Sequence, residues 1–216
     1  MIQLPKTYLS IDFETTGLDD DGDVSKVDII EAAVVLVENG KIIQQISGLA
    51  CPPQPISEKI TQITNITNNM LVGKPTPLEV FKTVIIPLFN ITTNIVGNNI
   101  LTFDRLFIEK YCKILNITPP PLNNYWDCGA FFKSIRQAHR AIKDLDLPKS
   151  QADLYNWTMP IMKYSYQQDR ILWNLDASSR YLGVSPFGMS GERHRALFDA
   201  QLAHRVFEKI REELSQ

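Results

Sequence analysis

Two acidic side chains, Asp12 and Glu14, stand two positions apart at the end of a predicted β-strand near the start of the chain. Side chains alternate across a strand, so both carboxylates point to one face while Phe13 points to the other. Like charges on one face repel each other, and a divalent cation bound by oxygen ligands would offset that repulsion. The pair therefore indicates a metal site. An acidic, solvated strand end is the alternative that this motif alone leaves open.

A third acidic residue, Asp104, begins a predicted helix shortly after a predicted strand that ends at Gly97. Ligands in α/β sheets gather just beyond the strand ends, which favours a role for Asp104 in binding. The helix dipole also favours an acidic residue at a helix N-terminus, so this position alone does not separate the two interpretations. Asn98 and Asn99 lie in the strand-to-helix loop, where amide side chains can hold a substrate terminus.

The segment GERHRALFDA, which begins at Gly191, supplies His194 and a further carboxylate, Asp199. On one continuous helix these two side chains would be separated by roughly 140° and could not meet. They converge only if His194 lies in the loop before the helix and Asp199 lies on the second turn of that helix. The other two histidines, His139 and His204, are expected to be ordinary surface or partly buried side chains.

The overall composition excludes some classes of protein. Of the 216 residues, 44% are hydrophobic and 21% are charged, which is typical of a globular protein. The longest apolar run, 32–37, is too short to span a bilayer, and no signal peptide is recognised. Three cysteines without a CxxC pair predict reduced thiols in an intracellular, cytoplasmic setting. A net charge of −2 argues against a protein that grips long duplexes by charge alone, but not against a site that holds phosphate through metal ions.

The elements that must position these side chains follow an α/β order in a single domain. Strands are predicted at Thr7–Phe13, Val27–Val37, Lys41–Gly48, Thr93–Gly97 and Tyr125–Cys128. Helices are predicted at Ile56–Ile66, Pro77–Leu88, Phe103–Leu115, Ala130–Ile142, Leu172–Leu182 and Arg195–Glu213. The tight-turn pair Asn39-Gly40 makes the second and third strands antiparallel, and Pro87 is expected to break the second helix. The pattern favours helices on a mixed sheet, with an inserted arm or extra helix at about 143–170.

Taken together, the three motifs resemble the DEDDh family of 3′–5′ exonucleases, which share the ribonuclease H-like fold. The motifs that match are IDFETTG at 11–17, NNILTFDRLFI at 98–108 and HRALFDA at 194–200. The connecting segments VDIIEAAVVLVENGKI, ISEKITQITNITNNML and LDASSRYLGV match as well, so the resemblance covers most of the chain. It implies an α/β, ribonuclease H-like fold with a mixed five-stranded sheet flanked by helices, in which the first three strands form an antiparallel meander.

The second motif departs from the family pattern in two ways. It usually carries His-Asn where this chain has Asn98-Asn99, so Asn99 is the matching asparagine. The interval before Asp104 is one residue longer than in the proofreading subunits of bacterial replicative polymerases. That spacing resembles the autonomous, repair-type members of the family.

The resemblance implies a catalytic set of four metal ligands and a general base, namely Asp12, Glu14, Asp104, Asp199 and His194. It implies two divalent cations, Mg²⁺ or Mn²⁺, which all-oxygen ligands also favour over zinc. Asp12 would bridge both ions. Glu14 and Asp199 would complete the water-activating ion, and Asp104 would support the second. His194 would take the proton of the attacking water, a task that suits a side chain titrating near neutral pH.

The residues expected to seat the terminal nucleotide are Thr16, Gly17, Leu18, Asn99 and Phe103, with Leu18 or Phe103 against a base face. The implied reaction is hydrolysis at a single-stranded or frayed nucleic-acid 3′ end, with release of nucleoside 5′-monophosphates and with DNA favoured. Two alternatives stay open, an exoribonuclease that trims RNA 3′ ends and a non-catalytic nucleic-acid-binding module. Candidate protein partners are a polymerase or a second copy of the chain, and no membrane partner is expected.

A basic helix face is a separate feature of residues 131–143. Lys133, Arg136, Arg140 and Lys143 follow a 3-4-3 spacing that places them together. The functional interpretation is a strip that contacts the nucleic-acid backbone, and the alternative is a solvated amphipathic face.

Overall fold

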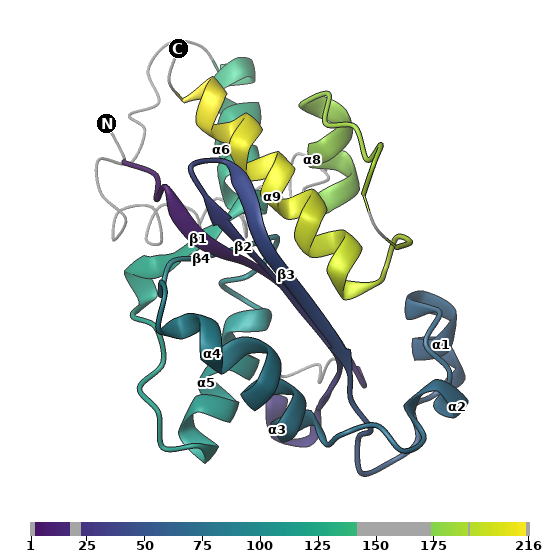
Figure 1. Ribbon diagram of the computed structural model, residues 1–216. Coiled ribbons are helices and arrows are strands. Elements are labelled where there is room, and N and C mark those ends of the chain that lie inside the picture. Colours follow the sequence, from purple (N-terminus) through teal and green to yellow (C-terminus); the bar gives the residue numbers. More distant parts are fainter. Residues whose placement is uncertain (1–2, 18–22, 142–173, 190, 215–216) are drawn as a thin grey trace.

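The computed structural model describes residues 3–17, 23–141, 174–189 and 191–214, with the backbone alone for residue 134 and residues 136–141. Within these ranges one mixed sheet has the strand order β3-β2-β1-β4-β5. Helices cover both faces of this sheet (Figure 1). The inserted arm predicted at about 143–170 lies outside the described residues. No helix in the described ranges is both long enough and apolar enough to cross a membrane.

Local sequence signals account for the strands. The strands are β1 (Thr7–Thr15), β2 (Ile29–Glu38), β3 (Lys41–Leu49), β4 (Ile95–Gly97) and β5 (Tyr125–Asp127). The first three form an antiparallel meander, and β4 and β5 add in parallel beyond β1. Asn39 and Gly40 turn the chain between β2 and β3 with φ values of 50° and 77°, as a tight hairpin requires. The predicted mixed sheet with its meander is confirmed.

The helical segments of the described residues follow the order of the predicted helices. They are α1 (Glu58–Thr64), α2 (Asn68–Leu71), α3 (Pro77–Val80), η2 (Phe81–Ile85), α4 (Ile86–Phe89), α5 (Asp104–Ile114), α6 (Cys128–Ala141), α8 (Leu175–Tyr181) and α9 (Ala196–Glu213), with short turns at Val24–Lys26 and Leu122–Asn124. The prediction missed the single turn of α2. It was wrong about Pro87, because the helix continues past that residue to Phe89. A π turn precedes the proline, with the Ile86 N–H donating to the Phe81 carbonyl, and this wider turn makes room for the ring.

Two hydrophobic cores lie on opposite faces of β1. Leu9 and Ile11 pack into the core beneath α5 and η2. Ser10, on the other face, donates a hydrogen bond of 2.8 Å from its Oγ to the carbonyl of Ala200 in α9. Even-numbered positions of β1 therefore face α9, and the two carboxylates of this strand share that face.

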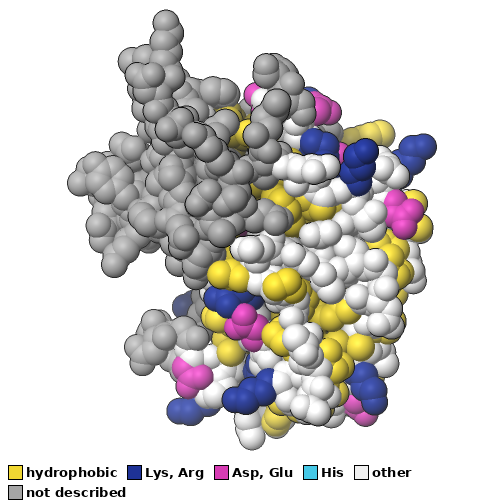
Figure 2. Space-filling model, turned by 90° about the vertical axis from the view of Figure 1, so that its left-hand side faces the viewer, with side chains coloured by type: hydrophobic (Ala, Val, Ile, Leu, Met, Phe, Trp, Pro, Cys, Tyr) yellow, Lys and Arg dark blue, Asp and Glu magenta, His cyan; other side chains and the backbone are white. Residues whose placement is uncertain are grey.

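The prediction of an exposed basic strip in residues 131–143 is wrong for its first member, Lys133. Lys133 is fully buried, as is Phe132 beside it, because α6 packs against both α8 and α9. Burial lowers the pKa of Lys133 to about 8, against the opposing effect of Asp127. On the face shown in Figure 2, the described Lys and Arg side chains are scattered among acidic and apolar ones instead of gathering into one patch. The remaining members of the strip lie outside the described side chains, namely Arg136, Arg140 and Lys143.

Gly97 ends β4 in a crowded position, which generates a prediction about stability. A Cβ at this residue would lie 2.9 Å from Ile100 Cδ1 and 3.0 Å from the carbonyl oxygen of Ile11. That oxygen belongs to the backbone of β1, which cannot move without moving the neighbouring carboxylate. We expect Gly97→Ala to lower the free energy of unfolding by roughly 1–3 kcal/mol, measured by urea denaturation.

Gly48→Ala is the matched control for that measurement. At Gly48 the nearest atom to an added Cβ is Val84 Cγ2, a side-chain atom at 3.3 Å. The control should therefore be clearly less destabilising than the change at Gly97. Equal losses for the two variants would contradict the crowding argument.

Candidate active site

Three carboxylates from opposite ends of the sequence meet at the end of β1. One ligand oxygen from each of Asp12, Glu14 and Asp199 lies within 4.8 Å of the others. The first two share one face of β1, as predicted. Asp199 lies in the first turn of α9 instead of the second, because the helix begins at Ala196. Packing of α9 across the sheet therefore creates the cluster.

Asp104 approaches the same strand end from α5. It is only 2% exposed, and its Oδ1 accepts a hydrogen bond of 3.0 Å from the backbone N–H of Phe13. Its charge contributes to raising the pKa of Asp12. Asp104 therefore lies beside the group of three carboxylates and is not one of the residues that come within 4.8 Å of one another.

Burial and mutual repulsion make ionisation of these four carboxyl groups costly. Burial is the largest cause of the raised pKa of each, and it raises the pKa of Asp104 to about 8. Burial together with repulsion from Asp199 raises the pKa of Glu14 to about 8. Repulsion from Asp199 also raises the pKa of Asp12. A divalent cation stabilises the ionised form of carboxylates that repel one another and are shielded from water. This set of carboxylate oxygens therefore fits such an ion.

His194 lies in the loop ahead of α9, where the sequence placed it. Its backbone adopts a left-handed conformation with φ of 60°, and its side chain is exposed. It lies close enough to Asp199 to help lower the pKa of that carboxyl. The side chain of His139 lies outside the described residues. His204 is buried in α9 and shares a hydrogen bond of 2.8 Å with the hydroxyl of Tyr8, so its role is structural.

The sequence interpretation missed the two arginines that flank this histidine. Arg193 forms ion pairs with Asp199 and, at 2.8 Å, with Asp176 of α8. Arg195 donates to both carboxylate oxygens of Glu31 in β2, at 2.9 and 2.6 Å. Their basic character beside an acidic motif was the only available signal, because their partners come from distant elements.

A cavity of about 520 Å³ opens beside Glu14. Thr16, Gly17 and Phe103, three of the residues expected to seat a terminal nucleotide, line it. Leu18 lies outside the described residues. Asn99 lies in the loop between β4 and α5 and is not part of the cavity wall.

Helix α1 forms the opposite wall of the cavity, a contribution that the sequence interpretation missed. Lys59, Ile60 and Ile63 line this side, and Ile63 is 46% exposed. The apolar spacing of this segment had indicated only a helix with one apolar face. An exposed isoleucine and a lysine in the wall of a cavity that also includes Glu14 offer an apolar surface to a base and a positive charge to a phosphate.

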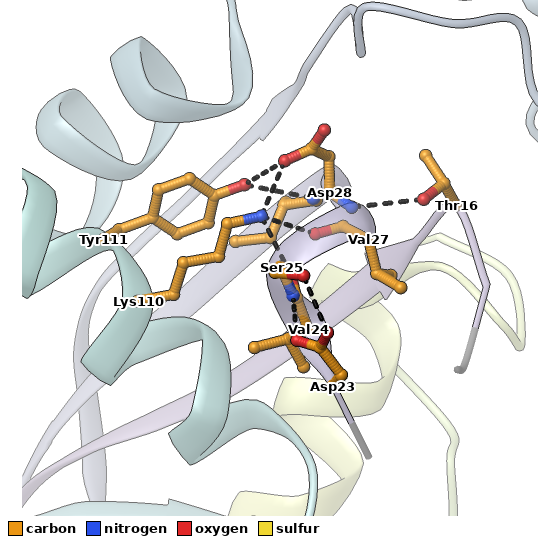
Figure 3. Close-up of polar contacts among 9 residues, drawn as sticks. Thr16, Asp23, Val24, Ser25, Val27, Asp28, Lys110 and Tyr111 are labelled. Atoms are coloured by element: carbon orange, nitrogen blue, oxygen red, sulfur yellow. Dashed lines mark hydrogen bonds and ion pairs between the residues drawn. The ribbon is translucent and has the colours of Figure 1, made fainter. Parts of the chain in front are cut away.

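A partly buried polar network fixes the turn that follows β1 (Figure 3). Thr16 and Asp28 exchange two hydrogen bonds, of 2.9 Å from the Thr16 N–H and 3.1 Å from the Asp28 N–H. Lys110 Nζ donates to Asp28 Oδ1 at 2.9 Å and to the carbonyl of Val27 at 2.7 Å. The hydroxyl of Tyr111 donates to the same carboxylate oxygen at 3.1 Å. Helix α5 therefore holds the cavity wall in place.

Asp127 performs the same task for the loop between β4 and α5. This carboxylate is fully buried, and it accepts hydrogen bonds from the backbone N–H groups of Asn99, Leu101 and Ala130 at 3.1, 3.3 and 3.1 Å. Asn99 has a φ of 62°, a conformation that asparagine tolerates better than most residues. The acid thus fixes the backbone between β4 and the first residue of α5, Asp104.

Comparison with known proteins agrees with this architecture. The model of the exonuclease family RNase_T matches residues 9–155, which include β1 and the loop that carries the second motif. The chain therefore belongs to this exonuclease family. The family depends on divalent metal ions, and the cluster of Asp12, Glu14 and Asp199 offers oxygen atoms that could hold such an ion.

Two relatives that are named as replication enzymes align with about half of this chain and with nearly all of it, respectively. DNA polymerase III subunit epsilon of Aquifex aeolicus (strain VF5) is 41% identical over 112 residues, which make up 51% of this chain and 51% of that protein. DNA polymerase III PolC-type of Clostridium perfringens (strain 13 / Type A) is 29% identical over an aligned length that covers 96% of this chain and 12% of that protein. The chain thus spans about half the length of the first relative and about an eighth of the second.

Solved structures share the fold at low sequence identity. Exonuclease X in complex with 5′ overhanging duplex DNA superposes with a TM-score of 0.62 at 21% identity, over 97% of this chain and 93% of that one. E. coli Exonuclease I in complex with a 5cy-dT13 oligonucleotide gives 0.67 at 16% identity, over 98% and 41%. The nuclease domain of 3′hExo, a DEDDh family member bound to rAMP, gives 0.60 at 18%, over 97% and 92%. The predicted ribonuclease H-like fold is confirmed.

The raised carboxyl pKa values generate a prediction about the metal-free protein. Between the ordinary pKa of glutamate, 4.5, and about 8, Glu14 holds its proton in the folded state only. The fold should therefore lose stability as pH rises through this window. In chelator, the urea midpoint should fall from pH 5 to pH 8, and Glu14→Gln should flatten that fall. Mg²⁺ should raise the wild-type midpoint more at pH 8 than at pH 5, because it binds the ionised carboxylates.

Glu58→Gln, which removes an exposed carboxyl of α1, is the control and should follow the wild-type pH dependence. If Glu14→Gln and wild type had identical pH dependence in chelator, Glu14 would be an ordinary solvated carboxyl and the crowded site would be disproved.

Proposed function

We propose that this chain is a 3′–5′ exonuclease that removes nucleotides from the 3′ end of DNA. The observation that carries the proposal is the meeting of Asp12, Glu14 and Asp199 within 4.8 Å, with the buried Asp104 beside them and a cavity against Glu14. Membership of the exonuclease family and the replication enzymes among the relatives support both the reaction and the choice of DNA.

The proposed reaction is hydrolysis of the terminal phosphodiester. Water attacks the phosphorus, the bond to the 3′ oxygen breaks, and that oxygen takes up a proton. The products are a nucleoside 5′-monophosphate and a strand that is one nucleotide shorter and ends in a 3′-hydroxyl.

The residues of the cluster have distinct roles in this proposal. Asp12, Glu14, Asp104 and Asp199 hold two divalent cations, Mg²⁺ or Mn²⁺, which when bound polarise the attacking water and stabilise the leaving oxygen. His194 takes the proton from the water, and its exposed position lets it pass that proton to solvent.

The cavity beside Glu14 supports a binding role for its walls. Thr16 and Gly17 seat the terminal nucleotide on one side, and Phe103 contributes an aromatic face. Asn99 and Leu18 complete the proposed set. A strand end must enter this cavity unpaired, so a single-stranded or frayed 3′ end is the proposed substrate.

The cellular setting follows from the relatives and the thiols. Cys51, Cys112 and Cys128 are all free, in keeping with a cytoplasmic protein. The relatives are named as DNA polymerase III components, so a replicative polymerase is the protein partner that we propose.

The activity is tested with 5′-labelled single-stranded DNA and RNA of one sequence. With Mg²⁺ or Mn²⁺ we expect a ladder that shortens one nucleotide at a time from the 3′ end, with DNA degraded faster, and no reaction in chelator. Asp12→Asn is the inactive control. Products that end in a 3′-phosphate, or undiminished activity in chelator, would exclude the mechanism, and faster degradation of RNA would exclude the preference for DNA.

The role of His194 is tested by substitution. We expect His194→Ala to lower kcat by roughly 10²–10⁴ while binding of Mn²⁺, followed by calorimetry, stays the same. His204→Ala is the matched control, since that side chain is buried against Tyr8, and its turnover per folded molecule should be close to wild type. Turnover of His194→Ala at the wild-type rate would remove the general-base assignment.

A further inference from the structure

The loop that carries His194 has an anchor that lies outside the acidic cluster. Arg195, the next residue, donates from Nε and Nη2 to the two oxygens of Glu31, at 2.9 and 2.6 Å. The backbone N–H of Ala196 donates to Glu31 Oε2 at 3.0 Å. One carboxylate of β2 therefore binds both the arginine at the end of the loop and the first N–H group of α9.

This contact fixes orientation as well as position. Glu31 is 4% exposed, so its charge needs nearby partners in place of water. The two-point fork of a guanidinium on a carboxylate sets the plane and the distance of both groups. Arg195, the N-cap residue of α9, makes no side-chain capping bond of its own, so Glu31 replaces the usual cap from another element.

Glu31 and Arg195 also influence the ionisation of Glu14. Glu31 and Glu14 are partners across the β1–β2 ladder. Glu31 raises the pKa of Glu14, and Arg195 lowers it. The guanidinium of Arg195 therefore keeps the charge of Glu31 from acting fully on a metal ligand.

Arg193, on the other side of His194, anchors the loop through one of the proposed metal ligands. Arg193 pairs with Asp199 and Asp176, and Asp199 is a carboxylate that a bound cation needs. A cation that takes Asp199 as a ligand would compete with Arg193 for the charge of that carboxylate. The contact between Glu31 and Arg195 uses none of the proposed ligands, so it can persist when the site is loaded.

We propose that Glu31 and Arg195 form a positioning pair that holds His194 in place for the hydrolysis, an inference that rests on the proposed general-base role of His194. Neither residue of the pair touches the reacting atoms. The pair acts by holding the backbone of the loop at the residue that follows the base.

The first test separates turnover from binding. Arg195→Gln should lower kcat on single-stranded DNA by roughly 10- to 100-fold, the loss that a small misplacement of a reacting group can cause. KM should stay within about twofold of wild type. The affinity for Mn²⁺, measured by calorimetry without substrate, should not fall, because the charge of Glu31 that Arg195 no longer offsets attracts a cation. Arg205→Gln is the control, because it also removes a positive charge from α9, and within the described part of the chain its guanidinium donates to the carbonyls of Ser185 and Phe187, away from the acidic cluster.

A double-mutant cycle with His194 makes the test specific. If Arg195 acts through His194, then Arg195→Gln should cause no further loss of kcat in a chain that already carries His194→Ala. Losses that add would overturn the proposal, because Arg195 would then act through the fold or the metal ligands. Arg195→Lys keeps the charge but loses the fork, and it replaces Arg195→Gln in every arm if the glutamine variant does not fold.

The outcomes distinguish this inference from the proposed function. If His194→Ala is slow and the Arg195 variant is fully active, the positioning role of Glu31 and Arg195 is overturned, and the proposed function stands. A His194→Ala variant with wild-type turnover overturns both. Loss of Mn²⁺ affinity in the Arg195 variant also overturns the pair, because its effect would then lie in metal binding.

Discussion

Repulsion among buried carboxylates at the end of β1 is the constraint that the surrounding structure must satisfy. One ligand oxygen from each of Asp12, Glu14 and Asp199 lies within 4.8 Å of the others. The three side chains are partly or fully buried, which adds to the free-energy cost of ionising them together. Such a cluster persists only where the fold holds the groups together more strongly than they repel. The fold does so by fixing each acid on a rigid element, β1 or α9, and by placing α5 against the same strand.

The same device recurs around the cluster. Three acids outside the proposed metal-binding set are held in the same way, namely Asp127, Glu31 and Asp28. Each accepts hydrogen bonds from backbone N–H groups or from a lysine or arginine side chain. Each ties a loop of the site to a distant element: the loop between β4 and α5, the loop before α9, and the turn after β1. A fully satisfied acid is a strong directional anchor in a low-dielectric interior. The residues that we propose to touch substrate can then lie on loops without losing their positions.

In the proposed site, Arg193 and a divalent cation would share one carboxylate, that of Asp199. In the structure the guanidinium of Arg193 pairs with Asp199 and with Asp176, and it lowers the pKa of both Asp12 and Asp199. It therefore reduces the cost of the cluster when no metal is bound. Asp176 would remain a partner of Arg193 if Asp199 bound the proposed cation, so the arginine would not need to leave the site.

By itself the sequence determined the strands, the turn at Asn39-Gly40, and the placement of Asp12 and Glu14 on one face, because these follow from local alternation and turn chemistry. It also determined the three motifs and so the family. Only the tertiary structure decided that Lys133 is buried, since α6 packs against α8 and α9, two helices that come later in the chain. It alone joined Arg195 to Glu31, 164 positions apart, and made α1 a wall of the cavity beside Glu14. Contacts of this kind depend on how elements pack, and no local pattern of residue types records them.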